Sequence, residues 1–305
     1  MFYKLDTTLI PCTMEESLKG DAPFVAALTP EEWECEKARF DFGIDLDMEL
    51  TDSRFTKAVV NCDCLTGTFS IPRRGNVCGR RACFAFAMDE KGIVFIDGDD
   101  DAEKLLETLH ATKKWRQPSL ERFVYDLLES IIQEDLPMLE GYESTLTGIE
   151  RRIMDGSTEN VTGRVNELRG DLLTLRSHYE QLIDLGQELE ENENGFFREE
   201  QLRLFHMFTD RVSRLQDNVA SLRDYAVQVR ELHQAQLDVR QNRTMAVLTV
   251  ITTLFLPLTV ITGWFGMNFE HMGILRESWG YPLIIALSVT IVAVCLLYFK
   301  RKKML

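Results

Sequence analysis

The sequence predicts an α+β membrane protein, and three observations lead to that fold class. Short alternating apolar runs fill about the first 115 residues, which indicates a cytosolic α/β domain. Apolar residues at spacings of three and four follow, which is typical of helices. Two long uncharged apolar runs then lie near the C-terminus, and each is long enough to cross a bilayer. The predicted segments are an α/β domain (1–115), an acidic helical hairpin (116–195), a very long cytosolic stalk helix (196–244), transmembrane helix 1 (245–265), an extracytoplasmic loop (266–279), transmembrane helix 2 (280–299) and a basic cytoplasmic tail (300–305).

The α/β domain is predicted from runs at 58–62, 82–86 and 92–96, each bounded by turn residues. Asp99 and Asp100 are expected to cap a helix that extends through His110. The region contains no phosphate-binding loop, no HExxH and no GxSxG, so we predict no enzyme activity.

The hairpin is predicted from an apolar stripe that begins at Leu120 and extends to Ile153, with a bend at Pro137. A break at Gly156-Ser157 precedes a second helix from about Glu159 to Glu190. The outer face of the hairpin is acidic and includes Glu134, Asp135, Glu140 and Glu143. We interpret this face as solvated surface, with a regulatory cation site as the alternative.

The stalk helix carries a heptad seam of apolar residues: Phe205, Phe208, Val212, Leu215, Val219, Leu222, Ala226 and Val229. No proline or glycine lies between Phe196 and Leu256, so the helix can continue into the first membrane span, for roughly 90 Å at 1.5 Å per residue. We expect so long a helix to pack against its own symmetry mates around an axis.

The membrane spans are Met245 to Phe265 and Gly280 to Phe299, neither of which contains a charged residue. Arg240 and Arg243 precede the first span, and Lys300 to Lys303 follow the second, so the positive-inside rule places both termini in the cytoplasm. The chain has 49 acidic and 34 basic residues and a net charge of −15, which argues against nucleic-acid binding.

One face of the first span collects hydroxyl, amide and small residues at heptad spacing: Asn242, Met245, Thr249, Thr252, Leu256, Thr259, Gly263 and Gly266. Opposite this face lie Val247, Leu254, Phe255, Leu258 and Ile261. This face allows either close helix packing or a water-filled axis, in which Met245 and Leu256 form apolar constrictions. Pro257 frees the Thr253 carbonyl and permits a local bend. With Gly266-Met267-Asn268 at the outer turn, the pattern favours a channel-like path for a hydrated divalent cation.

The run from Phe255 to Phe269, FLPLTVITGWFGMNF, resembles the signature of the CorA magnesium transporter family. The resemblance implies a homopentameric funnel, in which the first spans form an inner ring and the second spans an outer ring. It implies that Asn268 forms a ring at the pore mouth and binds a cation through its hydration shell, with Gly266 and Met267 beside it. The family's pore-facing positions coincide with Asn242, Met245, Leu248, Leu256, Thr259 and Gly263. Mg²⁺ is then substrate and possible regulatory ligand, with no cofactor, and the partners are the bilayer and further copies of the chain.

Two positions depart from the family's pattern. The loop reads Met272-Gly273-Ile274-Leu275 where Met-Pro-Glu-Leu is common, so a loop glutamate is absent there, and Glu270 and Glu277 are the available replacements. Met207 occupies the place of an aspartate that serves an inhibitory magnesium site in some members, with Asp210 one turn on. Asp210, Asp217 and the acidic hairpin are therefore the regulatory candidates.

Two alternatives to a magnesium transporter stay open: a transporter of Co²⁺, Ni²⁺ or Zn²⁺, and a non-conducting membrane-anchored scaffold or sensor. Met267 argues against the family's zinc branch. Cys62, Cys64, Cys78 and Cys83 could gather around zinc, but they lack paired C-x-x-C spacing. We interpret them as reduced strand residues.

Overall fold

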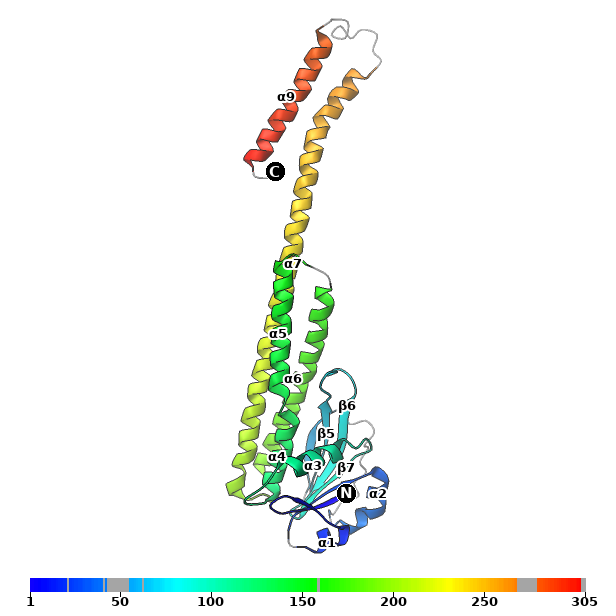
Figure 1. Cartoon of the computed structure of the whole chain (residues 1–305), viewed down its shortest axis with the longest axis vertical. Helices are drawn as coiled ribbons and strands as arrows, with labels where there is room; N and C mark the ends of the chain where they lie inside the picture. Colours follow the sequence, from blue (N-terminus) through cyan, green and yellow to red (C-terminus); the bar gives the residue numbers. More distant parts are fainter. Residues whose placement is uncertain are drawn as a thin grey trace. The chain divides into compact units, whose positions relative to one another are not determined.

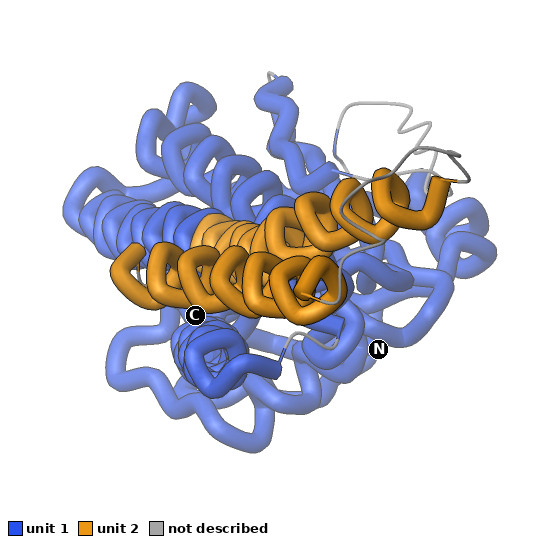
Figure 2. Tube along the Cα trace, turned by 90° about the horizontal axis from the view of Figure 1, so that it is seen from above, with its two compact units in different colours: residues 1–230 blue, residues 231–305 orange. Residues whose placement is uncertain are grey.

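The computed structural model describes residues 1–20, 22–40, 42, 55–61, 63–157, 160–267 and 279–302. The chain forms two compact units, Met1–Arg230 and Glu231–Leu305 (Figure 2). Each unit is described by itself below. The predicted fold class is confirmed, since an α/β domain comes first, a long helix follows, and an apolar helix closes the described chain.

Unit 1 contains a mixed sheet, which has seven strands in the part of the chain that the structure describes. Its order is β2-β1-β3-β7-β6-β5-β4, and only β3 and β7 pair in parallel among these strands. The strands are β1 Phe2–Leu5, β2 Leu9–Pro11, β3 Phe24–Leu28, β4 Lys57–Val60, β5 Leu65–Pro72, β6 Arg81–Met88 and β7 Gly92–Ile96. The three strands predicted at 58–62, 82–86 and 92–96 correspond to β4, β6 and β7.

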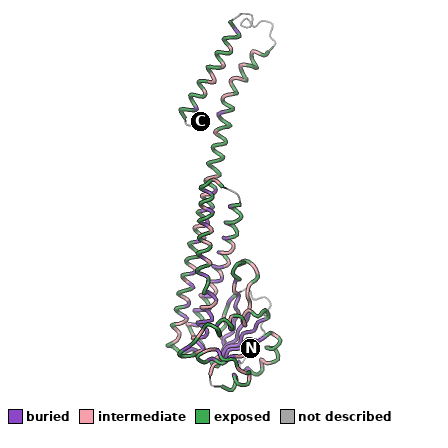
Figure 3. The backbone as a smooth tube through the Cα atoms, viewed as in Figure 1, coloured by how far each residue is buried: buried purple, intermediate pink, exposed green. Residues whose placement is uncertain are grey.

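Apolar side chains of the central strands point alternately to the two faces of the sheet, and other elements cover both faces. Ala85 and Ala87 of β6 pack on one face in a cluster with Trp33 of α2 (Pro30–Glu36). Phe84 and Phe86 point to the opposite face, which α3 (Asp101–Thr112) and α6 (Val161–Glu191) cover. A short helix α1 (Met14–Lys19) and a 3₁₀ turn (Lys37–Arg39) complete the N-terminal region. The purple residues in Figure 3 show that this sheet holds the core.

The start of α3 differs from the prediction that Asp99 and Asp100 cap it. Asp100 adopts a left-handed conformation with φ 59° and makes no side-chain cap. The buried Asp97 provides the cap, because its Oδ2 accepts from Ala102 N at 2.6 Å and its Oδ1 from Asp99 N at 2.8 Å. A carboxylate at a helix start satisfies backbone donors that have no partner within the helix.

Three helices and the beginning of a fourth lie side by side in unit 1 (Figure 1). They are α4 (Leu120–Ile132), α5 (Asp135–Met154), α6 and α7 (Arg203–Phe265), and a 3₁₀ turn (Glu199–Gln201) precedes α7. Pro137 does not bend a continuous helix as predicted. It lies in the first turn of α5, where a missing backbone donor costs nothing, and the chain breaks earlier, at Gln133 and Glu134.

The heptad seam of α7 packs inside the chain, so the expectation of packing against symmetry mates is wrong for residues 205–229. Each predicted seam residue is at most 8% exposed. A Cβ on Gly186 of α6 would lie 2.5 Å from Thr209 Oγ1, so these two helices approach closely. Tyr225 of α7 donates to Glu150 of α5 at 2.6 Å. The helical hairpin therefore supplies the apolar partner that this seam requires.

Unit 2 contains the C-terminal part of α7 and α9 (Gly280–Arg301), which run next to each other in both views (Figures 1 and 2). Both helices are long and apolar enough to cross a membrane. Their side chains remain largely exposed in the structure (Figure 3). α7 has 63 residues, which corresponds to about 95 Å at 1.5 Å per residue.

A buried carboxylate, Asp126 of α4, fixes the connection between α3 and α4. It is 2% exposed and accepts hydrogen bonds from Lys113 Nζ and Trp115 Nε1, both at 2.8 Å, and from Arg122 Nε at 3.1 Å. Burial alone raises the pKa of Asp126, but the bonds from Lys113 and Trp115 and the charge on Arg122 outweigh it and lower that pKa below its usual value.

Asp126→Asn is expected to lower the free energy of unfolding by about 2 kcal/mol at pH 7, because Lys113 and Trp115 lose a charged acceptor. A depressed carboxyl pKa stabilises the fold above the unfolded pKa of about 3.9, and the stabilisation is lost as pH falls through the folded pKa. Thermal unfolding of wild type and variant should therefore converge at acidic pH. An equal difference in melting temperature at pH 7 and pH 3 would contradict this assignment. Exposed Asp63→Asn is the control.

Candidate functional site

The membrane part of α7 presents two opposite faces. The less exposed residues in this part of α7 follow one stripe along the helix: Ala246, Val250, Leu254, Pro257, Leu258, Ile261 and Phe265. The less exposed residues of α9 likewise follow one stripe: Gly280, Ile284, Ser288, Ile291, Val292, Cys295 and Phe299. Because the two helices lie side by side, these stripes are the faces that they turn toward each other. At 100° per residue, the predicted polar stripe of α7 is centred about 200° from its α9-facing stripe.

All the predicted stripe residues are exposed in the structure: Asn242, Met245, Leu248, Thr249, Thr252, Leu256, Thr259 and Gly263. Leu256 reaches 70% exposure and Met245 56%. Of the residues predicted to lie opposite this stripe, Leu254, Leu258 and Ile261 are less exposed, whereas Val247 and Phe255 are 51% and 58% exposed. The structure also shows that Leu254, Leu258 and Ile261 lie on the side of α7 that faces α9. The polar stripe is thus left uncovered by its own chain.

The threonine hydroxyls of the polar stripe donate to their own helix. Thr249 donates to Met245 O at 2.8 Å, Thr252 to Leu248 O at 2.9 Å and Thr259 to Phe255 O at 2.9 Å. Since each hydroxyl hydrogen is engaged, each oxygen offers only acceptor lone pairs to the outside. Water molecules bound to a cation are hydrogen-bond donors. The stripe can therefore accept hydrogen bonds from a hydrated cation without removing its water.

α7 continues through Pro257 to Phe265, so the proline is accommodated within a continuous helix. Beyond it, Gly266 N donates to Thr262 O at 2.9 Å and Met267 N to Trp264 O at 3.4 Å. A Cβ on Gly266 would lie 2.8 Å from Thr262 O, which no side chain tolerates without a shift. Gly266 therefore permits the tight turn that ends the helix. Asn268, Glu270, the 272–275 segment and Glu277 lie outside the described residues.

Asp210, the regulatory candidate, belongs to a short chain of charged groups in unit 1. His206 Nε2 lies 3.6 Å from Asp210 Oδ2, and His206 Nδ1 lies 3.2 Å from Glu190 Oε1. His206 was not among the predicted residues, although its spacing of four residues from Asp210 on one helix was an available signal. Within the described ranges, the structure contains no group of three or more His, Cys, Asp or Glu residues arranged to hold a metal ion.

The acidic outer face of the hairpin divides into two parts. Glu140 and Glu143 are exposed, and they line a groove with Asn218 and Tyr225 of α7. Asp135 is buried at 5% exposure, so its assignment to the solvated face is wrong. It accepts from Tyr179 Oη at 3.0 Å, and burial raises the pKa of Asp135.

The cysteines are separated in the structure. Cys64 is buried beside Asn61, Cys78 lies 3.5 Å from Thr174 Oγ1 of α6, and Cys83 lies 3.7 Å from Ser70 Oγ. Cys62 lies outside the described residues. Each described thiol thus has a different neighbourhood, which agrees with reduced strand and loop residues.

Comparisons with known proteins agree with this architecture. A family model described as CorA-like Mg²⁺ transporter protein matches residues 43–301. The cobalt/magnesium transport protein CorA of Thermotoga maritima is 28% identical over 190 residues, which are 62% of this chain and 54% of that protein. The magnesium transport protein CorA of Wolinella succinogenes is 42% identical over 77 residues, which are 25% of this chain and 24% of that protein.

The complete structure of the CorA magnesium transporter from Methanocaldococcus jannaschii has the same fold. Its TM-score is 0.81 at 19% identity, and the match covers 99% of this chain and 98% of that one. The sequence match to the Thermotoga relative spans about half of that protein's length, whereas the fold likeness extends along the whole chain. Since the family model covers residues 43–301, the chain belongs to the CorA-like Mg²⁺ transporter family.

Proposed function

We propose that the chain is a transporter that passes hydrated divalent cations down their electrochemical gradient through a channel-like pore in the cytoplasmic membrane. The observation that carries the proposal is the polar stripe of α7, which lies opposite the α9-facing stripe and is covered by nothing in its own chain. A hydroxyl and amide stripe on a membrane-long apolar helix is unfavourable against lipid. Water along a shared axis can form hydrogen bonds with this stripe, whereas lipid tails cannot.

The pore in this proposal is formed by copies of the chain around an axis. α9 covers one side of α7 and the polar stripe faces the axis, so α7 forms the inner ring and α9 the outer ring. A homopentamer is the assembly that the family resemblance implies. Both termini face the cytoplasm, because the basic residues flank the two spans on the same side.

Mg²⁺ is the proposed ion, supported by the relatives from Wolinella and Methanocaldococcus, which are named magnesium transporters. Magnesium loses its water reluctantly, and neutral oxygens that accept from bound water suit it. The Asn268 amide at the mouth and the Thr oxygens below it are such acceptors. Co²⁺ is the second candidate, because the Thermotoga relative is named a cobalt/magnesium transport protein. The alternative of a non-conducting scaffold does not explain why a polar stripe on a membrane helix is left uncovered.

Asn268→Ala is expected to abolish Mg²⁺ uptake into liposomes that carry the purified protein, because the variant lacks the amide oxygen that captures the hydrated ion at the mouth. A membrane potential of 100 mV, which supplies about 2.3 kcal/mol per charge, should drive wild-type uptake. The oligomer, measured by light scattering, should be unchanged. Wild-type uptake by this variant would rule out Asn268 as the pore-mouth ligand.

Thr259→Val is expected to reduce Mg²⁺ flux at least about fivefold, since one lost hydrogen bond to bound water is worth about 1 kcal/mol. Thr290→Val on α9 is the matched control. Thr290 is also exposed and donates to Ala286 O at 2.7 Å, but it lies on the side of α9 away from α7. Equal fluxes in the two variants would contradict the assignment of the α7 stripe to the pore.

Asp210→Ala is expected to weaken inhibition of transport by internal Mg²⁺, because it removes a carboxylate one turn from the position where some family members carry an inhibitory-site aspartate. Flux is measured in proteoliposomes that are loaded with increasing Mg²⁺, and Asp63→Ala serves as an exposed control. An unchanged inhibition curve would remove Asp210 from the regulatory residues.

A further inference from the structure

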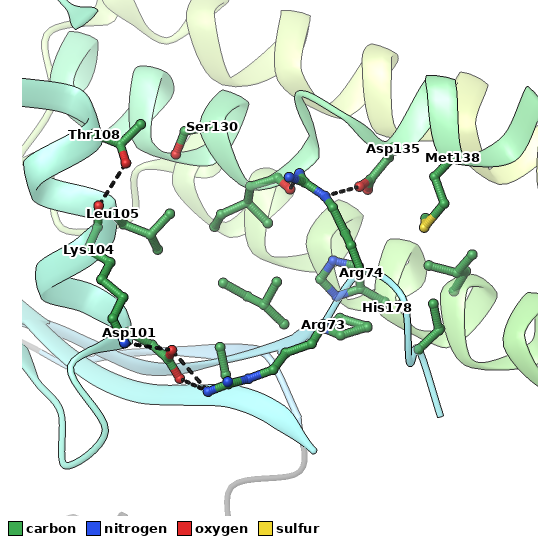
Figure 4. Close-up of a pocket in the computed structure, with 16 residues that line it drawn as sticks. Arg73, Arg74, Asp101, Lys104, Leu105, Thr108, Ser130, Asp135, Met138 and His178 are labelled. Carbon is green, nitrogen blue, oxygen red and sulfur yellow. Dashed lines mark hydrogen bonds and ion pairs between the residues drawn. The ribbon is translucent and has the colours of Figure 1, made fainter. Parts of the chain in front are cut away.

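A cavity of about 370 Å³ lies in unit 1, and all its lining residues fall between Ile71 and His178. It is formed where the β5–β6 hairpin and α3 meet α4, α5 and α6, and Figure 4 shows the side chains that line it. Its walls are mainly apolar, with Val77, Leu105, Ile131, Met138 and Leu175 among the lining residues. A volume of this size lies within the range of small-molecule sites, which combine apolar walls with a few convergent polar groups.

The hairpin that borders the cavity is the basic part of an acidic chain. Residues 72–81 read PRRGNVCGRR, with four arginines and no acidic residue, whereas the whole chain has a net charge of −15. Arg74 is fully engaged, since it donates to Glu134 at 2.7 Å and to Ile131 O at 3.1 Å and lies 3.7 Å from Asp135. Arg80 pairs with Asp99 at 2.7 Å.

The mouth of the cavity carries an excess of positive charge. Arg73 and Lys104 both approach the single carboxylate of Asp101 (Figure 4). Arg73 reaches it through Nη2 alone, at 2.8 and 3.0 Å, and Lys104 Nζ remains 4.0 Å away. Arg73 Nε and Nη1 make no hydrogen bond to any residue in the described part of the chain. Two cations with free donors therefore share one anion at this position.

A buried polar atom also lines this cavity. His178 of α6 is 2% exposed, lines the cavity, and its Nδ1 has no hydrogen-bond partner among the described residues. Burial, and then the charge on Arg81, lower the pKa of His178 to about 3, so the ring is neutral at physiological pH. A buried polar atom without a partner is unfavourable unless a ligand or water satisfies it.

We propose that this cavity binds a small phosphorylated molecule that carries a flat heteroaromatic ring, such as a nucleoside monophosphate. The phosphate lies at Arg73 and Lys104, where planar guanidinium donors and a point charge suit a dianion. The ring lies against the apolar walls and shares a hydrogen bond with His178 Nδ1. The site is independent of the proposed transport, since none of its residues belongs to the membrane helices or to the Asp210 group.

Isothermal titration calorimetry on the full-length protein in detergent and in metal-free buffer tests the proposal. AMP should bind, whereas adenosine and inorganic phosphate, which each fill one end of the site, should bind at least about tenfold more weakly. Benzoate tests for a carboxylate ligand, and tighter binding of benzoate than of AMP would overturn the choice of a phosphate. Absence of AMP binding to protein with native circular dichroism would overturn the site.

Three variants locate the binding. Lys104→Gln should weaken AMP binding about fivefold, and His178→Phe should weaken it by a similar factor while it preserves the ring. Leu105→Trp should abolish binding by filling the cavity. Lys19→Gln is the matched control, since Lys19 is an exposed helical lysine 3.8 Å from Glu15 and far from the lining residues in sequence. If His178→Phe fails to fold, the other two variants still decide. AMP binding that neither Lys104→Gln nor Leu105→Trp changes would overturn the assignment.

Discussion

The structure depends on one constraint, which is that a single uninterrupted helix of 63 residues must satisfy two environments. Between Phe205 and Val229 it needs an apolar partner, and the helical hairpin provides one so completely that the seam is buried. From Met245 to Phe265 it carries mainly apolar side chains and no charged residue, with one stripe that collects threonines and glycines. The helix continues without a break between these two parts. The change from a buried apolar seam to an exposed polar stripe therefore comes from the side chains that the sequence places on each face.

The membrane part of that helix separates its two contacts by rotation. Side chains repeat every 3.6 residues, so α9 and the polar stripe occupy opposite sides of α7. The threonines keep their hydroxyl hydrogens on the helix backbone and present oxygens outward. This arrangement allows an apolar helix to carry acceptors without unsatisfied donors, which would be costly in a bilayer. The proposed pore uses those acceptors for bound water rather than for the bare ion.

Several charged side chains of unit 1 are buried where separate elements meet. Asp97, Asp126 and Asp135 are all buried, and each accepts hydrogen bonds that join separate elements. The arginines of the β5–β6 hairpin attach it to α3 and α5 through Asp101 and Glu134. The cavity below the hairpin results from this attachment, since charged groups hold the elements together at its rim while apolar side chains line its walls.

The sequence by itself determined the fold class, the two apolar helices and the polar stripe, because hydrophobic periodicity and uninterrupted apolar length are local properties. It also determined the strands in β4, β6 and β7 from alternation. Predictions from the sequence were wrong where packing between residues far apart in the chain determines the position of a side chain. Periodicity showed that the α7 seam is buried, but only the tertiary structure showed that α5 and α6 cover it. Asp97 rather than Asp99 or Asp100 caps α3, and Asp135 is buried rather than solvated, because side-chain position depends on neighbouring elements. The cavity joins residues up to 107 positions apart, from Ile71 to His178, and no local pattern predicts such a meeting.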